Sequence, residues 1–117
     1  MIDGPELDGL KSKNVIECIY DLSELDKNIL SLLSEDEGLR SSEIADKIDK
    51  DQSTAYRSLE KLADCGLIYK EKQNIRNGGY YFLYSKRPLD KIKEEAKRSV
   101  ERWRDEVIEA IEKLDDL

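Results

Sequence analysis

The chain of 117 residues contains no histidine and only two cysteines, Cys18 and Cys65, which lie far apart in the sequence. Protein zinc sites are built from clustered cysteine and histidine ligands, so we expect no metal site and no cofactor. The usual nucleophile–base pairs also need a histidine, and we therefore predict that the protein is not an enzyme. We expect the two thiols to be reduced, small core residues, with a disulfide as the alternative.

Long apolar runs are also missing, so the sequence predicts neither a membrane span nor a signal peptide, and a cytoplasmic protein is expected. The first residues, Met1 to Pro5, are polar and turn-like, and we expect this end to be frayed. Charged residues make up 40% of the chain and hydrophobic residues 38%. A single domain with a modest core follows, of a size that often relies on a partner.

The net charge of −7 is unevenly distributed along the chain. Residues 50–87 contain 8 basic and 4 acidic residues and carry +4, whereas residues 1–49 carry −8 and residues 88–117 carry −3. Because salt screens charges beyond about 10 Å, a basic surface formed by 50–87 still attracts phosphate at short range. The distribution therefore permits nucleic-acid binding, with a weak non-specific component.

The run from Asp51 to Ile68 organises the rest of the sequence. Asp51 is a suitable N-cap for a helix, and Gly66 is suited to the left-handed turn that ends it. One side of this helix is apolar, and the opposite side carries hydroxyls and cations with no acid before Asp64. The apolar positions are Ala55, Leu59 and Leu62, and the polar ones are Ser53, Thr54, Arg57 and Lys61. Such a helix fits the DNA major groove, and the alternative is an ordinary solvated surface helix.

The neighbouring segments place this helix in a larger pattern. A second short helix is expected from Ser41 to Ile48, and two alternating strands, residues 67–73 and 80–85, flank a glycine turn. Upstream, residues 13–20 form a short helix, and Ser23 with Asp26 forms a capping box for the next one. The buried face of that helix should comprise Leu25, Ile29, Leu32 and Leu33, widened by Leu30. The order predicts a mostly helical α+β fold, a winged helix-turn-helix.

These motifs resemble archaeal TrmB-like transcriptional regulators and, in outline, MarR-type domains. The matching runs are Ser42-Glu43-Ile44-Ala45, Ser53-Thr54-Ala55-Tyr56-Arg57-Ser58-Leu59, Gly66-Leu67-Ile68 and Gly78-Gly79-Tyr80-Tyr81. The resemblance covers most of the chain and implies a DNA-binding regulator. Full-length sugar-sensing members carry a large C-terminal effector domain, whereas this chain ends after one long helix. No sugar site is therefore carried over, and the small-molecule effector is unknown.

The last segment, residues 88–117, is expected to be a dimerisation helix attached to a winged domain formed by residues 1–87. Its apolar residues recur every three or four positions, which is the spacing of a coiled coil. These residues are Ala96, Val100, Trp103, Val107, Ala110, Leu114 and Leu117, with Ile111 broadening the stripe. A helix from Leu89 to Leu117 would be roughly 43 Å long, and we expect it to pair, parallel or antiparallel, in a homodimer. The alternative is that it folds back over its own first helices.

The sequence thus predicts a homodimeric regulator that reads double-stranded DNA. Gln52 suits adenine and Arg57 suits guanine, while serines at a helix N-terminus suit phosphate unless one of them merely caps the helix. The candidate DNA-binding residues are Ser41, Ser42, Gln52, Ser53, Thr54, Tyr56, Arg57, Lys61, Lys72, Asn74 and Arg76. The alternative is a winged helix that docks on another protein and reads no bases, which the net acidity favours.

Overall fold

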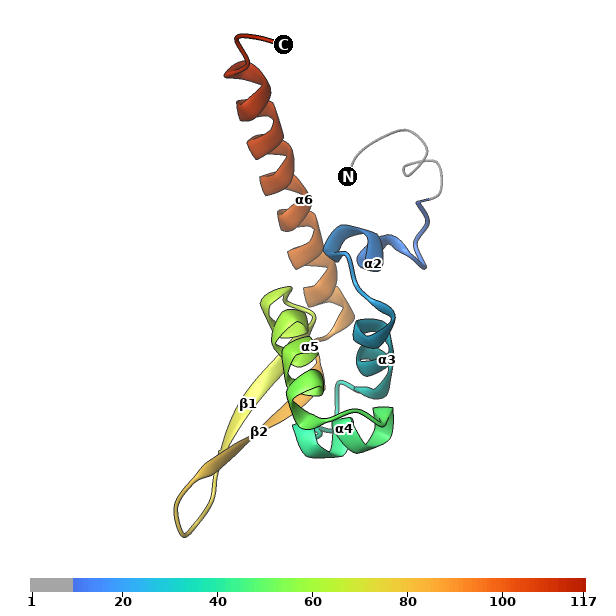
Figure 1. Cartoon of the computed structure of the whole chain (residues 1–117), viewed down its shortest axis with the longest axis vertical. Coiled ribbons are helices and arrows are strands. Elements are labelled where there is room, and N and C mark those ends of the chain that lie inside the picture. The colour runs from blue at the N-terminus through green and yellow to red at the C-terminus, as the bar shows by residue number, and fades with distance from the viewer. Residues whose placement is uncertain (1–9) are drawn as a thin grey trace.

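The computed structural model describes residues 10–117, so Met1 to Pro5 and their expected fraying lie outside the described residues. Its element order is α2 (Val15–Tyr20), α3 (Glu24–Leu32), α4 (Ser41–Ile48), α5 (Gln52–Asp64), β1 (Ile68–Asn74), β2 (Tyr80–Lys86) and α6 (Leu89–Glu112). Helices α3, α4 and α5 form one body, from which the β1–β2 hairpin and α6 extend in opposite directions (Figure 1). The predicted mostly helical α+β fold is confirmed.

Local side chains fix where the central helices begin and end. Ser23 Oγ accepts from the Asp26 amide at 3.1 Å while the Asp26 carboxylate accepts from the Ser23 amide at 2.9 Å, as predicted for a capping box. Asp51 caps α5 by accepting from the Thr54 amide at 2.8 Å. At the other end Gly66 adopts a φ of 79°, a left-handed conformation that glycine takes without steric cost.

The core lies where α3, α4 and α5 meet the base of the hairpin. The predicted buried face of α5 is confirmed, because Ala55, Leu59 and Leu62 are all fully buried. Leu32 was expected in the core but is 38% exposed. Helix α3 ends at Leu32, and the extended backbone of the next residue turns Leu33 into the core instead.

The hairpin alternates as the sequence predicts, with Lys70 opposite Tyr84 and Lys72 opposite Phe82. Tyr84 is buried, so one face of the hairpin base belongs to the core. Leu39 adds a bridge that the sequence analysis missed: its amide donates to the Tyr84 carbonyl at 3.0 Å, and its carbonyl accepts from the Tyr84 amide at 2.8 Å. A single bridging residue has no periodicity from which a strand could be predicted.

Helix α6 is shorter than predicted. It ends at Glu112, which makes it about 36 Å long at 1.5 Å per residue, and Leu114 and Leu117 follow its end. Its last turn contains no basic residue, and Asp115 and Asp116 follow two and three residues after its C-cap, Lys113. Negative charge near a helix C-terminus opposes the helix dipole and disfavours further helical turns.

The two halves of α6 have different surroundings. Ile92 and Ala96 are buried in the first half, and Ser99 Oγ lies 3.2 Å from the hydroxyl of Tyr20 in α2. Beyond Ser99 the helix projects away from the body, so the molecule is 61 Å long but only 28 Å across (Figure 1). The base of α6 thus packs on the first helices, as the fold-back alternative proposed, and the rest does not. Within residues 10–117, no helix is long and apolar enough to cross a membrane.

Candidate nucleic-acid interface

The N-terminal half of α5 presents neutral polar side chains and one cationic side chain to solvent. Four side chains are exposed there: Gln52, Ser53, Tyr56 and Arg57. Tyr56 is 46% exposed. Ser53 Oγ donates to the Asp51 carboxylate at 3.2 Å. Hydrogen bonds from Thr54 lower the pKa of Asp51, so this cap stays ionised and anchors the first turn. The helix start is therefore held in place while its outer side chains remain accessible.

The C-terminal half of α5 is acidic on its outer side. The expectation that no acid precedes Asp64 on this side was wrong, because Glu60 lies there too, half-buried and 3.1 Å from Lys70 on β1. Lys70 is thereby paired with Glu60, and the hydrogen bond between the two side chains raises the pKa of Lys70. Since carboxylates repel phosphate, the N-terminal half is the part of α5 that suits a nucleic acid.

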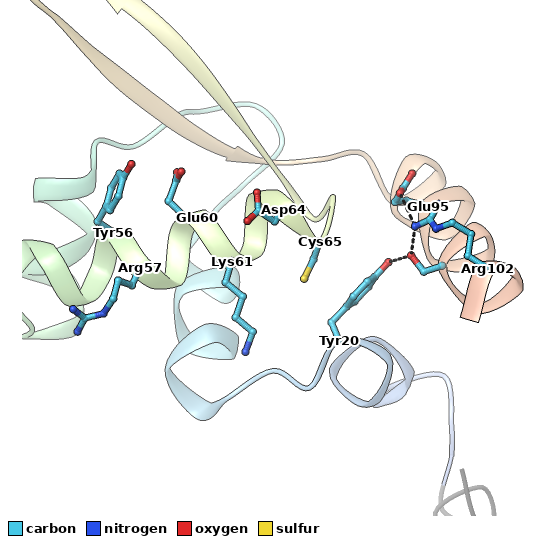
Figure 2. A pocket seen from close by; sticks show the side chains of 10 residues that line it. Tyr20, Tyr56, Arg57, Glu60, Lys61, Asp64, Cys65, Glu95 and Arg102 are labelled. Atoms are coloured by element: carbon cyan, nitrogen blue, oxygen red, sulfur yellow. Dashed lines mark hydrogen bonds and ion pairs between the residues drawn. The ribbon is translucent and has the colours of Figure 1, made fainter. Parts of the chain in front are cut away.

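Lys61 extends from the same side of α5 as Arg57, but it points toward the start of α3 (Figure 2). Its Nζ donates to the Asp26 carboxylate at 2.7 Å and to the carbonyl of Asp21 at 2.9 Å. The hydrogen bond with Asp26 raises the pKa of Lys61. The ammonium group thus has two intramolecular partners, with which a phosphate contact by Lys61 would compete.

Asp26 is the buried partner that the sequence analysis missed. Its side chain is almost fully buried and accepts from Ser58 Oγ at 2.5 Å as well as from Lys61 and the Ser23 amide. Burial raises the pKa of Asp26, but the hydrogen bonds from Lys61, Ser58 and Ser23 outweigh it and lower the pKa to about 2. The clue in the sequence was Ser58, a polar residue on the apolar side of α5 that requires a partner once buried.

The start of α4 places Ser41 and Ser42 as its first two residues, both half-buried. Arg40 occupies the N-cap position, and the Glu43 carboxylate accepts from the Arg40 amide at 2.9 Å. The alternative in which one of the two serines caps this helix is therefore wrong. Both serines lie at the positive end of the helix dipole, which favours anions.

The hairpin carries cations stacked against aromatic rings. Lys72 Nζ lies 4.3 Å from the centroid of the Tyr80 ring, and Lys70 Nζ lies 4.4 Å from that of Phe82. Such cation–π contacts hold the amines close to the hairpin surface. Asn74 and Arg76 are exposed toward the tip of the hairpin, which extends well beyond the body (Figure 1).

An open cleft of about 580 Å³ separates the outer side of α5 from the base of α6 (Figure 2). Both charge signs line it: the basic residues are Arg57, Lys61 and Arg102, and the acidic ones are Glu60, Asp64 and Glu95. Cys65 also lines the cleft, half-buried, and burial raises its pKa. Cys18 is exposed, contrary to the expectation that both thiols lie in the core, and both cysteines are free. Among the described residues, no group of acids and cysteines could hold a metal ion.

A helix pair with a short turn, followed by a two-stranded hairpin, defines the winged helix-turn-helix class. Residues 16–90 match the family model described as "Sugar-specific transcriptional regulator TrmB". The match covers more than half of the chain, and the chain belongs to this family. The resemblance inferred from the sequence is confirmed.

The chain is also similar to known structures and sequences. A possible transcriptional regulator from Methanosarcina mazei Go1 has the same fold, with a TM-score of 0.68 and 23% identity over 92% of this chain and 91% of that one. An uncharacterised protein of Methanocaldococcus jannaschii is 26% identical over 102 residues, which are 87% of this chain and 77% of the relative. An uncharacterised HTH-type transcriptional regulator of Pyrococcus furiosus is 40% identical over 62 residues, but the match covers only 42% of its length.

The buried Asp26 generates a prediction for stability. Its pKa is about 2 in the folded chain, against 3.8 for a free aspartate side chain, so its stabilising effect is complete above pH 4 and is lost as the pH falls toward 2. Asp26→Asn should lower the free energy of unfolding by about 2 kcal/mol at pH 7, measured by urea denaturation. The exposed Asp46→Asn on α4 is the control and should change stability by less than about 0.5 kcal/mol. The difference between the Asp26 variant and wild type should shrink at pH 3, and a difference that stays constant would contradict this account.

Proposed function

We propose that this protein is a sequence-specific DNA-binding transcriptional regulator that acts as a homodimer in the cytoplasm. The proposal rests on the N-terminal half of α5, which exposes polar and cationic side chains on one side and buries apolar side chains on the other. Membership of a family of transcriptional regulators supports it. In this proposal residues 1–87 form the DNA-binding domain and residues 88–117 form the dimerisation segment.

In the proposed complex the N-terminal half of α5 enters the major groove, as recognition helices do. Gln52 and Arg57 reach base edges, where the amide suits adenine and the guanidinium suits guanine. Ser53 and Thr54 contact phosphate, and Tyr56 lies against the backbone or a base on the hairpin side. The acidic C-terminal half of α5, with Glu60 and Asp64, stays outside the groove.

The flanking elements would then hold the DNA backbone. Ser41 and Ser42 present the N-terminus of α4 to a phosphate, because helix amides and hydroxyls there favour an anion. Lys72, Asn74 and Arg76 on the hairpin contact the adjacent phosphates or the minor groove. These contacts position the protein, and specificity comes from the base contacts of α5.

The free half of α6 supports dimerisation by a second copy of this chain. Its apolar residues form what we term the α6 stripe: Val100, Trp103, Val107, Ala110 and Ile111. Val100 is 45% exposed and Ile111 62%, although an apolar helix face at coiled-coil spacing is normally buried by a partner helix. Ala96 packs on the body, and Leu114 and Leu117 follow the helix end, so these three residues are left out of the stripe. A dimer would bind two half-sites roughly 10 bp apart or a multiple of that.

The rival function is a winged helix that docks on another protein. The net charge of −7 and the acidic outer end of α5 favour it. The two functions differ in how binding responds to salt, because phosphate contacts release counterions and protein docking does not.

Fluorescence anisotropy with a random duplex tests the proposal against this rival. A chain that makes about four phosphate contacts should lose roughly a hundredfold in affinity between 50 and 200 mM salt. The absence of measurable binding to any duplex at 50 mM salt would favour the docking module instead.

Arg57→Ala should cost about 1–3 kcal/mol of binding to a duplex selected by the wild type from a random pool. It should also relax the base preference at one position in each half-site, because the guanidinium no longer reads guanine. Arg104→Ala, which removes an exposed arginine from α6, serves as the charge-matched control and should leave the preference intact. An equal loss on selected and random duplexes would mean that Arg57 contacts only phosphate.

Val107→Glu should convert the dimer into a monomer, because a charge within a coiled-coil interface must be desolvated without a partner. Analytical ultracentrifugation at micromolar concentration measures the change. Arg98→Glu adds the same side chain on the opposite side of α6, nine residues away, and should remain dimeric. A dimeric Val107→Glu variant would exclude the α6 stripe as the interface.

A further inference from the structure

We propose that Asp26 is a positioning residue for DNA recognition: by holding Ser58 and Lys61 it fixes the rotation of α5 about its own axis. That rotation decides which side chains of α5 face the bases. The inference rests on the proposed function and adds a residue that touches no DNA.

The contact is a two-point attachment. One carboxylate oxygen of Asp26 accepts from Ser58 Oγ at 2.5 Å and the other accepts from Lys61 Nζ at 2.7 Å. Ser58 and Lys61 are three residues apart and so lie on neighbouring turns of α5. The buried leucines decide which side of α5 faces the body, but the hydrophobic attraction is non-directional and depends little on small rotations of the helix. Two directional bonds to one buried group resist both rotation and sliding.

Asp26 itself is fixed by the first turn of α3. Its carboxylate also accepts from the Ser23 amide at 2.9 Å, and its side chain is nine-tenths or more buried. Lys61 is held a second time by the carbonyl of Asp21, which lies just before α3. The attachment therefore ties α5 to a rigid part of the body, and the carboxylate cannot follow α5 if the helix turns.

Arg57 directly precedes Ser58, so the attachment acts next to the proposed base contact. A helix with its side chains has a radius of about 6 Å, and a rotation of about 20° moves its outer groups by about 2 Å. Hydrogen-bond lengths span only about half an ångström, so this displacement breaks a bidentate contact with a base. Contacts with phosphate are less dependent on geometry and largely survive it.

The two possible roles of Asp26, positioning α5 and stabilising the fold, predict different effects on DNA binding. If Asp26 only stabilised the fold, its loss would reduce the folded fraction and weaken binding to every duplex by the same factor. If it sets the rotation of α5, its loss lowers affinity for a selected duplex more than for a random one. The ratio of the two affinities is therefore the diagnostic quantity.

The experiment uses the full chain and a duplex that the wild type selects from a random pool. Affinities for the selected and a random duplex are measured by anisotropy for wild type, Asp26→Asn, Ser58→Ala and the exposed control Asp46→Asn, at a temperature where circular dichroism shows each variant to be folded. We expect the affinity ratio to fall about tenfold in Asp26→Asn, by a smaller factor in Ser58→Ala, and not at all in Asp46→Asn.

Each result decides the inference. A wild-type ratio in folded Asp26→Asn overturns it while leaving the proposed function intact. If Asp26→Asn does not fold, Ser58→Ala decides, because it removes one of the two bonds and leaves the acid paired with Lys61. A wild type that prefers no duplex removes the proposed function and this inference with it.

Discussion

The fold depends on one constraint, the burial of the apolar side of α5. A helix of 13 residues is marginal on its own in water, so its stability comes from packing. Leu59 and Leu62 are fully buried against α3 and α4, and each such side chain contributes about 1.5–3 kcal/mol. Once these two residues face inward, the helix period places Ser53 and Arg57 outward. The composition of the outer surface is therefore a consequence of how the core is filled.

Some of the basic residues in 50–87 are paired with acids within the molecule and are less available to phosphate. Lys61 is paired with Asp26, and Lys70 is paired with Glu60. Arg57 remains at the surface, with its guanidinium 3.5 Å from Thr54 Oγ1. Two of the eight basic residues in 50–87 are thus paired within the molecule, which weakens the non-specific attraction to phosphate.

Patterns within one element were predictable from the sequence, and contacts between elements were not. The bounds of α4 follow from its apolar periodicity, the start of α5 follows from the Asp51 cap, and the end of α5 follows from Gly66. The hydrogen bond between Asp26 and Ser58 joins residues 32 positions apart in the sequence. Because the capping box already accounted for Asp26, the sequence did not require a further partner for it. The pairing of Lys61 with Asp26 could not be predicted for the same reason, since its partner lies on another helix.

The small side chains at the base of α6 give the molecule the geometry of a lever. Ala96 and Ser99 bring the helix close to the body, and the remaining turns extend freely from that pivot (Figure 1). For the arm of about 20 Å that lies beyond Ser99, a tilt of about 10° at the base moves the far end by about 3.5 Å. That displacement matches one base-pair step of DNA, about 3.4 Å. Modest repacking beneath Ala96 is thus magnified into a large change at the tip of the helix.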